Sequence, residues 1–229
     1  MTIDPTNTGG AGLVARAKNI LLTPQAEWDR IAAEPADVNK IYIGYVLPLV
    51  VLAAVCSFIG LSVFGAGAFG VTYRVPVVPG LIGAALQVIT GIAGVFILAF
   101  ITNALAPSFG SQQDMGQAHK LAAYGSTAGF LGGVFAIFPP IALLGIVGLY
   151  SLVLIYIGLP RLMKTPEDKR IGYFIAIILV AIVVWIVIGV VVGTVRTSMG
   201  GMGMPGYTFG QSTPGPRTGG ASGEVTLPG

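Results

Sequence analysis

The chain has 229 residues, of which 54% are hydrophobic and only 9% are charged, whereas an ordinary soluble domain carries about 25% charged residues. So few charged side chains cannot cover a water-facing surface, which excludes a soluble globular protein. The net charge of +3 is spread along the chain rather than gathered in a stripe, which argues against nucleic acid as a partner. The single cysteine, Cys56, excludes an intrachain disulfide and a cysteine-based metal site.

Residues 1–40 are predicted to form a cytoplasmic segment that precedes the membrane-spanning part. A helix near residue 17 has one apolar face, opposite its basic residues. The apolar face consists of Leu13, Val14, Ala17, Ile20 and Leu21. Thr23-Pro24 then predicts a second short helix, because threonine is a favoured N-cap and proline a favoured first helical residue. We expect one or two amphipathic helices in the membrane interface. Their predicted lipid contacts are Arg16, Lys18, Trp28 and Arg30.

Residues 41–195 are predicted to be an all-α domain with five membrane-spanning helices. A bilayer core of about 30 Å needs roughly 20 apolar residues in a helix. The predicted spans are 41–64, 80–106, 121–138, 141–159 and 172–193. The uncharged run 121–160 is twice the length of one span, and Pro139-Pro140 at its middle predicts a tight turn between two spans. Because both arms are short, a re-entrant hairpin is the alternative.

The orientation follows from the distribution of Lys and Arg, which are in excess on the cytoplasmic side of membrane proteins. Nine of them flank the spans on one side: Arg16, Lys18, Arg30, Lys40, Lys120, Arg161, Lys164, Lys169 and Arg170. Only Arg74, Arg196 and Arg217 lie on the other. We therefore expect a cytoplasmic N-terminus and an exterior C-terminus. Residues 196–229 are rich in Gly, Pro, Ser and Thr, and this composition predicts a disordered tail.

No catalytic, cofactor or metal site is predicted. The five predicted spans contain no Asp, Glu, Lys or Arg, and the only histidine, His119, lies at a span boundary. Coupled pumps and intramembrane enzymes need ionisable residues at depth, so both classes are disfavoured. The polar residues Gln87, Asn103 and Thr127 are predicted to form hydrogen bonds between helices or, alternatively, to line a polar path.

Glycines at intervals of four residues predict close helix packing, because small residues let helix backbones approach each other in lipid. Gly125, Gly129 and Gly133 share one face of the third span, and Gly189 and Gly193 repeat the spacing in the fifth. Internal packing is favoured over a contact between two copies of the chain, although the spacing is compatible with both.

Several phrases in this order resemble the Yip family of multi-span membrane proteins. They are Arg16-Ala17-Lys18-Asn19-Ile20-Leu21-Leu22-Thr23-Pro24, Glu27-Trp28, Ala123-Tyr124-Gly125-Ser126, Tyr150-Ser151-Leu152, Gly158-Leu159-Pro160 and Lys164-Thr165-Pro166-Glu167-Asp168-Lys169. The resemblance covers about residues 13–195 and is greatest to the bacterial branch, whose function is mostly unassigned. It implies five spans, a cytosolic N-terminus and a role as a membrane organiser or adaptor.

Two departures limit what the resemblance implies. The acidic motif before the first span of eukaryotic members has no counterpart beyond Glu34-Pro35-Ala36-Asp37, so a trafficking role through Rab proteins is not carried over. The third span has Ala128 and Gly129 where a proline is often found. The leading hypothesis is a non-enzymatic protein of a bacterial cytoplasmic membrane that contacts lipids, other membrane proteins or a second copy. The alternative is a passive channel, transporter or lipid-moving protein.

Overall fold

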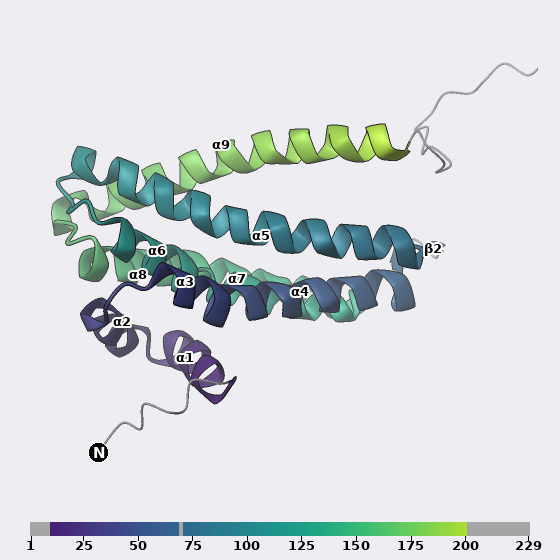
Figure 1. Ribbon diagram of the computed structural model, residues 1–229, viewed down its shortest axis with the longest axis horizontal. Helices are drawn as coiled ribbons and strands as arrows, with labels where there is room; N and C mark the ends of the chain where they lie inside the picture. Colours follow the sequence, from purple (N-terminus) through teal and green to yellow (C-terminus); the bar gives the residue numbers. More distant parts are fainter. Residues whose placement is uncertain (1–9, 69–70, 201–229) are drawn as a thin grey trace, which may run out of the picture. The chain divides into compact units, whose positions relative to one another are not determined.

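The computed structural model describes residues 10–68 and 71–200 (Figure 1). The chain divides into two compact units, Met1–Trp185 and Ile186–Gly229, and each is described by itself. The helices begin with α1 (Gly10–Leu22), α2 (Pro24–Ala33), α3 (Val38–Ile41) and α4 (Leu47–Ile59). The antiparallel strands β1 (Ala66–Ala68) and β2 (Val71–Tyr73) pair Ala66 with Tyr73. The later helices are α5 (Val77–Leu105), α6 (Met115–Gly125), α7 (Thr127–Gly132), α8 (Tyr150–Leu162) and α9 (Glu167–Gly200).

Four helical stretches in the described residues are long and apolar enough to cross a membrane: Val38–Phe64, Val77–Phe109, Leu143–Leu162 and Glu167–Val190. They overlap four of the five predicted spans, and the chain is an integral membrane protein. The predicted third span, 121–138, is not among them because its helix is interrupted. It consists of the end of α6, the single short helix α7 and a 3₁₀ turn at Gly133–Ile137.

Serine and glycine account for the interruption between α6 and α7. The Oγ of Ser126 donates to the carbonyl oxygen of Ala122 at 2.7 Å, which competes with the helical hydrogen bonding of the backbone. Each glycine in a helix interior costs about 1 kcal/mol relative to alanine. The prolines at 139 and 140 begin a second 3₁₀ helix, Pro139–Leu149, which leads into α8. A 3₁₀ helix rises about 2.0 Å per residue against about 1.5 Å for an α-helix, so these short arms reach further than their residue number suggests.

Residues 115–138 nevertheless lie beside the first span from its beginning to its end. At one end, the rings of Tyr42 and His119 meet edge to face with centroids 5.5 Å apart. At the other end, Phe64 and Phe138 meet in the same way at 5.3 Å. The third segment therefore runs in the same direction as the first span and covers the same length.

The first span, Val38–Phe64, is widened by two π-helical turns, Tyr42–Val46 and Gly60–Phe64. The first π-helical turn comes just before Pro48, which has no backbone N–H and whose ring clashes with the carbonyl group four residues earlier. A π turn relieves this conflict at the cost of weaker helical geometry. The second turn begins at Gly60, where the third segment approaches most closely.

Gly60 provides a stability test because the structure contains a matched control. A Cβ at Gly60 would lie 1.9 Å from the carbonyl oxygen of Ala136, whereas a Cβ at Gly44, in the other π turn, has nothing within 4 Å. We expect Gly60→Ala to lower the free energy of unfolding by about 1–3 kcal/mol, the usual cost of overpacking. Gly44→Ala is expected to leave it nearly unchanged. SDS-induced unfolding of both purified variants measures the difference, and equal stabilities would contradict this packing.

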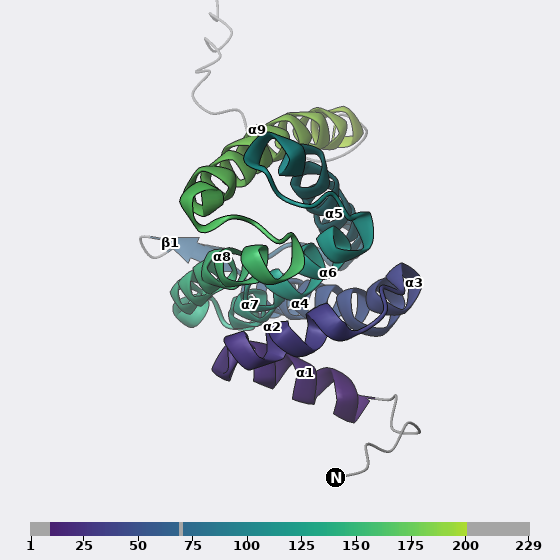
Figure 2. The same ribbon diagram turned by 90° about the vertical axis from the view of Figure 1, so that its left-hand side faces the viewer.

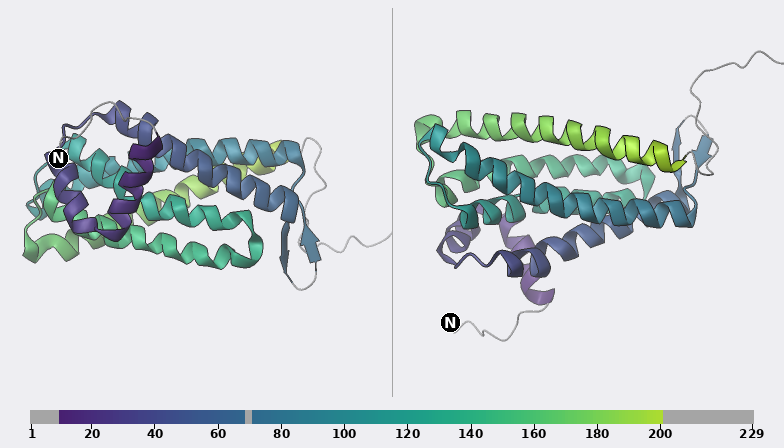
Figure 3. Two further views of the ribbon diagram at one scale, coloured as in Figure 1. Left: turned by 90° about the horizontal axis from the view of Figure 1, so that it is seen from below. Right: turned by 45° about the horizontal axis from the view of Figure 1, so that its top comes forward.

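The N-terminal helices α1 and α2 pack against one side of the first unit. Figure 2, which looks along the long helices, shows α1 and α2 extending sideways across them, and Figure 3 (left) shows α1 crossing the direction of α4 and α5. The main hydrophobic core extends from the long helices to the contact of these two helices with α6 and α8, where it includes Ile20, Trp28, Leu121, Leu154 and Leu159. The N-terminal segment is therefore part of the folded unit.

The C-terminal boundary differs slightly from the predicted one. Helix α9 continues to Gly200, so residues 196–200, predicted as the start of the tail, are helical. Residues 201–229, predicted to be disordered, lie outside the described residues.

Candidate functional site

The candidate site is the contact between the N-terminal helices and the span bundle, and Trp28 is its apolar centre. Trp28 and Ile31 are both 0% exposed, on the same face of α2. A Cβ at Gly158 of α8 would lie 3.0 Å from the indole ring of Trp28 and 2.4 Å from Leu121 of α6. The absence of a side chain at Gly158 therefore provides the space into which the tryptophan packs.

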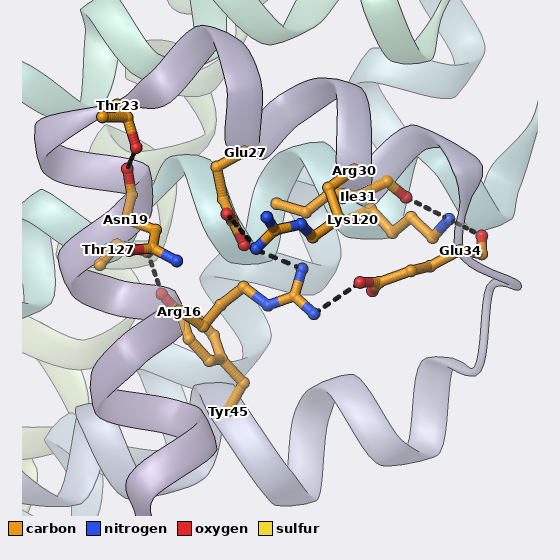
Figure 4. A network of polar contacts seen from close by, with 10 residues as sticks. All are labelled: Arg16, Asn19, Thr23, Glu27, Arg30, Ile31, Glu34, Tyr45, Lys120 and Thr127. Atoms are coloured by element: carbon orange, nitrogen blue, oxygen red, sulfur yellow. Dashed lines mark hydrogen bonds and ion pairs between the residues drawn. The ribbon is translucent and has the colours of Figure 1, made fainter. Parts of the chain in front are cut away.

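Arg16 joins α1 to α2 by ion pairs (Figure 4). Its guanidinium lies 3.2 Å from the carboxylate of Glu27 and 2.7 Å from that of Glu34, and Arg30 also pairs with Glu27 at 3.2 Å. The same guanidinium lies over the ring of Tyr124, 5.4 Å from its centroid. Burial lowers the pKa of Arg16, but the hydrogen bond with Glu34 and the neighbouring negative charges raise it more, so the pKa lies above its ordinary value.

Lys120 of α6 binds the carboxyl end of α2, as Figure 4 also shows. Its side chain is buried, and Nζ donates to the carbonyl oxygens of Ile31, at 2.8 Å, and of Glu34. The last carbonyl groups of a helix have no partner within it, and they carry partial negative charge that a cation stabilises. Desolvation lowers the pKa of Lys120, while the charges of Glu34 and Asp114 oppose the shift. Lys120 thus fixes the position of α2 relative to α6.

Two tyrosines of the first π turn extend the polar contacts to the third segment. The hydroxyl of Tyr45 is 2.7 Å from Oγ1 of Thr127, which donates in turn to the carbonyl oxygen of Tyr124. The hydroxyl of Tyr42 is hydrogen-bonded to Nδ1 of His119 at 3.0 Å. The π turn therefore presents both tyrosines to helices α6 and α7.

His119 predicts a pH dependence of stability. The rings of Tyr42 and Phe96 cover it, and desolvation lowers its pKa below the ordinary value. The unfolded chain then takes up the proton first, at about pH 6.5. The stability contributed by the neutral ring is complete above that pH and is lost as the pH falls through the folded pKa. We expect the unfolding temperature in detergent to fall by a few degrees from pH 7 to pH 5. His119→Gln should flatten this dependence; an unchanged slope would assign it to other groups.

The predicted lipid contacts occupy two different environments. Lys18 is exposed, and Arg30 has a side chain that is 63% exposed although it pairs with Glu27. Arg16 and Trp28 instead point into the protein, so their side chains are used for packing between helices rather than directed to lipid headgroups. Val14, predicted on the apolar face of α1, is 63% exposed. The apolar face that packs on the bundle is thus rotated from the predicted one.

The glycines of the third segment contact two different neighbours. The side chains closest to an added Cβ are Ile155 for Gly125, Ser151 for Gly129 and Ala53 for Gly133. The first two glycines thus face α8, while the third faces α4. Gly189 and Gly193 belong to the second unit, and their packing role stays a prediction.

The residues predicted for a polar path lie at different heights along the helix axes. Gln87 donates to Ser57 at 3.4 Å, and Thr127 bonds Tyr45. Ser57 and Tyr45 are in one helical stretch, and their separation in sequence corresponds to about 18 Å along its axis. The Oδ1 of Asn103 is buried without a hydrogen-bond partner. None of the contacts in the described residues joins these three side chains to one another, so a polar path stays a prediction.

Sequence reasoning missed Glu27, Glu34 and Lys120 as parts of one cluster. The spacing of Glu27 and Arg30, three residues apart on a helix, was a usable signal for an ion pair. Lys120 gave no such signal, because a lysine at the end of an apolar run is typical of a membrane boundary. Both carboxylates are bound to arginine, and the described residues contain no group of three His, Cys, Asp or Glu side chains that could hold a metal ion. The cluster's chemistry is electrostatic attachment of α1 and α2.

The Lys-Thr-Pro phrase is a turn between α8 and α9. Thr165 is buried, accepts a hydrogen bond from Oγ of Ser111 at 3.0 Å and donates to the carbonyl oxygen of Leu159 at 3.2 Å. The preceding Lys164 has a φ of 52°, a left-handed conformation that is strained for a side chain larger than glycine. Thr165 therefore closes a tight turn next to the end of α5.

Most of the chain is similar in sequence to known proteins. A family model described as the Yip1 domain matches residues 18–188. The chain is 23% identical over 164 residues to the inner membrane protein YohC of Escherichia coli K12, and the alignment covers 69% of this chain and 84% of that protein. The YohC protein of Escherichia coli O6:H1 matches to the same extent. No solved structure matches.

Proposed function

The chain belongs to the Yip1 domain family, and from this membership and the described geometry we propose that it is a non-enzymatic membrane organiser or adaptor. It acts through lipid and protein contacts in a bacterial cytoplasmic membrane. The observation that carries the proposal is the attachment of α1 and α2 to the spans through Trp28 and the buried Lys120, with partly buried ion pairs joining α1 to α2. This attachment holds a folded surface at one end of the bundle.

The proposal includes five membrane crossings, with residues 121–138 as the third. The part of the chain that the structure describes contains four candidate spans, and the third segment lies beside the first over its whole length. Residues 139–159, which follow the Pro139-Pro140 turn, support a further full crossing. Their contacts with the third segment are spread along its length: Gly148 approaches Gly129, and Gly158 approaches Leu121. A re-entrant hairpin would turn back halfway along the first span rather than beside Phe64, its last residue.

The orientation we propose has the N-terminal helices and the 162–170 turn in the cytoplasm. The excess of Lys and Arg on that side supports it. Five crossings then place the β1–β2 hairpin and the C-terminal end of α9 outside. The E. coli relative is named as an inner membrane protein, which supports the same membrane for this chain.

Labelling of single cysteines tests the topology. Cys56 is buried, so Cys56→Ala provides a cysteine-free background. Cysteine at Glu167, whose side chain is 92% exposed, should be shielded from an impermeant maleimide in intact spheroplasts, whereas cysteine at exposed Arg74 should react. Labelling of both positions from outside would contradict the three crossings proposed between Arg74 and Glu167.

Cross-linking tests the adaptor role against the alternative of a passive transporter. A photoreactive amino acid at exposed Ala33 of α2 should give discrete lipid or protein products in cells, while the same group at buried Ala118 gives only intramolecular ones. Solute or lipid flux in reconstituted vesicles that Gln87→Leu abolishes would instead establish the transporter. Gln87→Leu removes the bond to Ser57 without touching the N-terminal helices.

A further inference from the structure

Helix α1 presents an outer face that the protein itself leaves uncovered. Val14 is 63% exposed and Leu22 is 69% exposed, and the exposed Lys18 lies between them. Their spacing of four residues places all three on one side of the helix. The opposite side is held by Ala17 and Ile20, which are buried. The outer face is thus two apolar side chains with a cation between them.

The attachment of α1 fixes the direction of this face. Arg16 binds α2 from the inner side, and the hydroxyl of Tyr150 in α8 donates to the carbonyl oxygen of Leu21 at 3.2 Å. Figures 2 and 3 show α1 lying across the long helices, at the outside of the first unit. If the spans run along the membrane normal, as the proposed topology requires, this arrangement sets α1 parallel to the bilayer surface.

The depth of α1 follows from the same contacts. Arg16 lies over Tyr124, whose ring is 4.7 Å from that of Tyr45. Tyr45 follows Lys40, the last charged residue before the apolar part of the first span, by about 7 Å of helix at 1.5 Å per residue. An amphipathic helix in the membrane interface is buried about 5–10 Å into the headgroup and acyl boundary. The contacts place α1 at that depth.

Four exposed lysines on this side, Lys18, Lys40, Lys164 and Lys169, form no side-chain ion pair or hydrogen bond among the described residues, and Lys18 is the one of them on α1. Arg16, Arg30, Arg161 and Arg170 each form an ion pair, and Lys120 binds carbonyl oxygens. In the described residues Lys18 forms neither, and α1 contains no Asp or Glu. A lysine between two apolar side chains at the interface extends its ammonium group to lipid phosphate.

We propose that the outer face of α1 binds anionic phospholipid of the cytoplasmic leaflet. Val14 and Leu22 pack among the upper acyl chains, and the ammonium group of Lys18 pairs with a headgroup phosphate. The proposal rests on the topology in the proposed function and assigns the lipid class and the residues. It moves the lipid contact away from Arg16 and Trp28, which hold the helix in place.

The test uses the full chain in nanodiscs of phosphatidylcholine with phosphatidylglycerol. In the Cys56→Ala background, a bimane label on Val14→Cys should be quenched by lipid carrying a nitroxide near the top of the acyl chain and protected from aqueous iodide. A label on Glu167→Cys should show the reverse. Lys18→Gln should weaken retention of phosphatidylglycerol about fivefold, which corresponds to about 1 kcal/mol per basic residue at an anionic surface. Lys164→Gln, also exposed, is the matched control.

Three outcomes overturn the proposal. The first is quenching of the Val14 label by aqueous iodide. The second is a Val14 label shielded from both lipid and water, which a protein partner would cause. The third is retention of phosphatidylglycerol that Lys18→Gln leaves unchanged. None of them alters the labelling of Glu167 and Arg74 that tests the crossings. The lipid contact and the proposed topology therefore fail independently.

Discussion

Trp28→Ala is expected to lower the free energy of unfolding by about 3–5 kcal/mol, the usual cost of removing a fully buried tryptophan. Trp28 is 0% exposed and packs on α8 in the space left by Gly158, next to Leu121 of α6. Its removal opens a cavity that rigid spans cannot close. Because α2 has only ten residues, it has little stability without this contact. The variant should therefore also detach the N-terminal helices.

The other tryptophan provides the control. Trp185 is 51% exposed, and Trp185→Phe is expected to change stability by less than about 1 kcal/mol. In that background Trp28 is the only tryptophan, so its fluorescence reports directly on the attachment of α2. A blue-shifted emission that aqueous quenchers do not reach is expected. Emission at the wavelength of water-exposed indole would show that α2 is not attached to the spans.

The hydropathy pattern was sufficient to predict the long spans, because each apolar run is long enough as a helix to cross the bilayer and ends at prolines or charged residues. It failed to anticipate the broken third segment, where local hydrogen bonding by Ser126 and the low helix propensity of glycine interrupt a run that is apolar throughout. Because the segments on either side of Pro139-Pro140 are short, the sequence did not distinguish two full spans from a re-entrant hairpin. The number of residues alone does not reveal that eleven of them form a 3₁₀ helix, which is longer per residue than an α-helix.

The N-terminal helices show a different limit of prediction from sequence. Apolar periodicity and the Thr23-Pro24 pair predicted one or two short helices here, and two are present. An apolar helical face, however, fits burial in lipid and burial in protein equally well. A tryptophan before a span is typical of the membrane interface, whereas Trp28 packs on Gly158. Only the three-dimensional placement of Lys120, far along the chain, reveals the site that receives the end of α2.

Glu27→Gln is expected to have the second large effect, a loss of about 3 kcal/mol, near the lower end of what breaking a buried ion pair costs. The Glu27 side chain is only 4% exposed and receives both Arg16 and Arg30. Glutamine keeps the size of the side chain but removes its charge, so Arg16 is left partly buried with Glu34 as its one remaining carboxylate. Thermal unfolding and SDS titration measure the loss.

The matched control is Glu167→Gln, which also removes a glutamate paired with an arginine three residues later, but at a side chain that is 92% exposed. An exposed pair of this kind is worth about 0.3–0.5 kcal/mol. A double-mutant cycle with Arg16→Met then isolates the contribution of the Arg16–Glu27 pair, and additive losses would show that the two residues do not interact. If they do interact, Glu27→Gln should expose Trp28 to aqueous quenchers before the spans unfold, because the ion pair and the tryptophan hold the same helix.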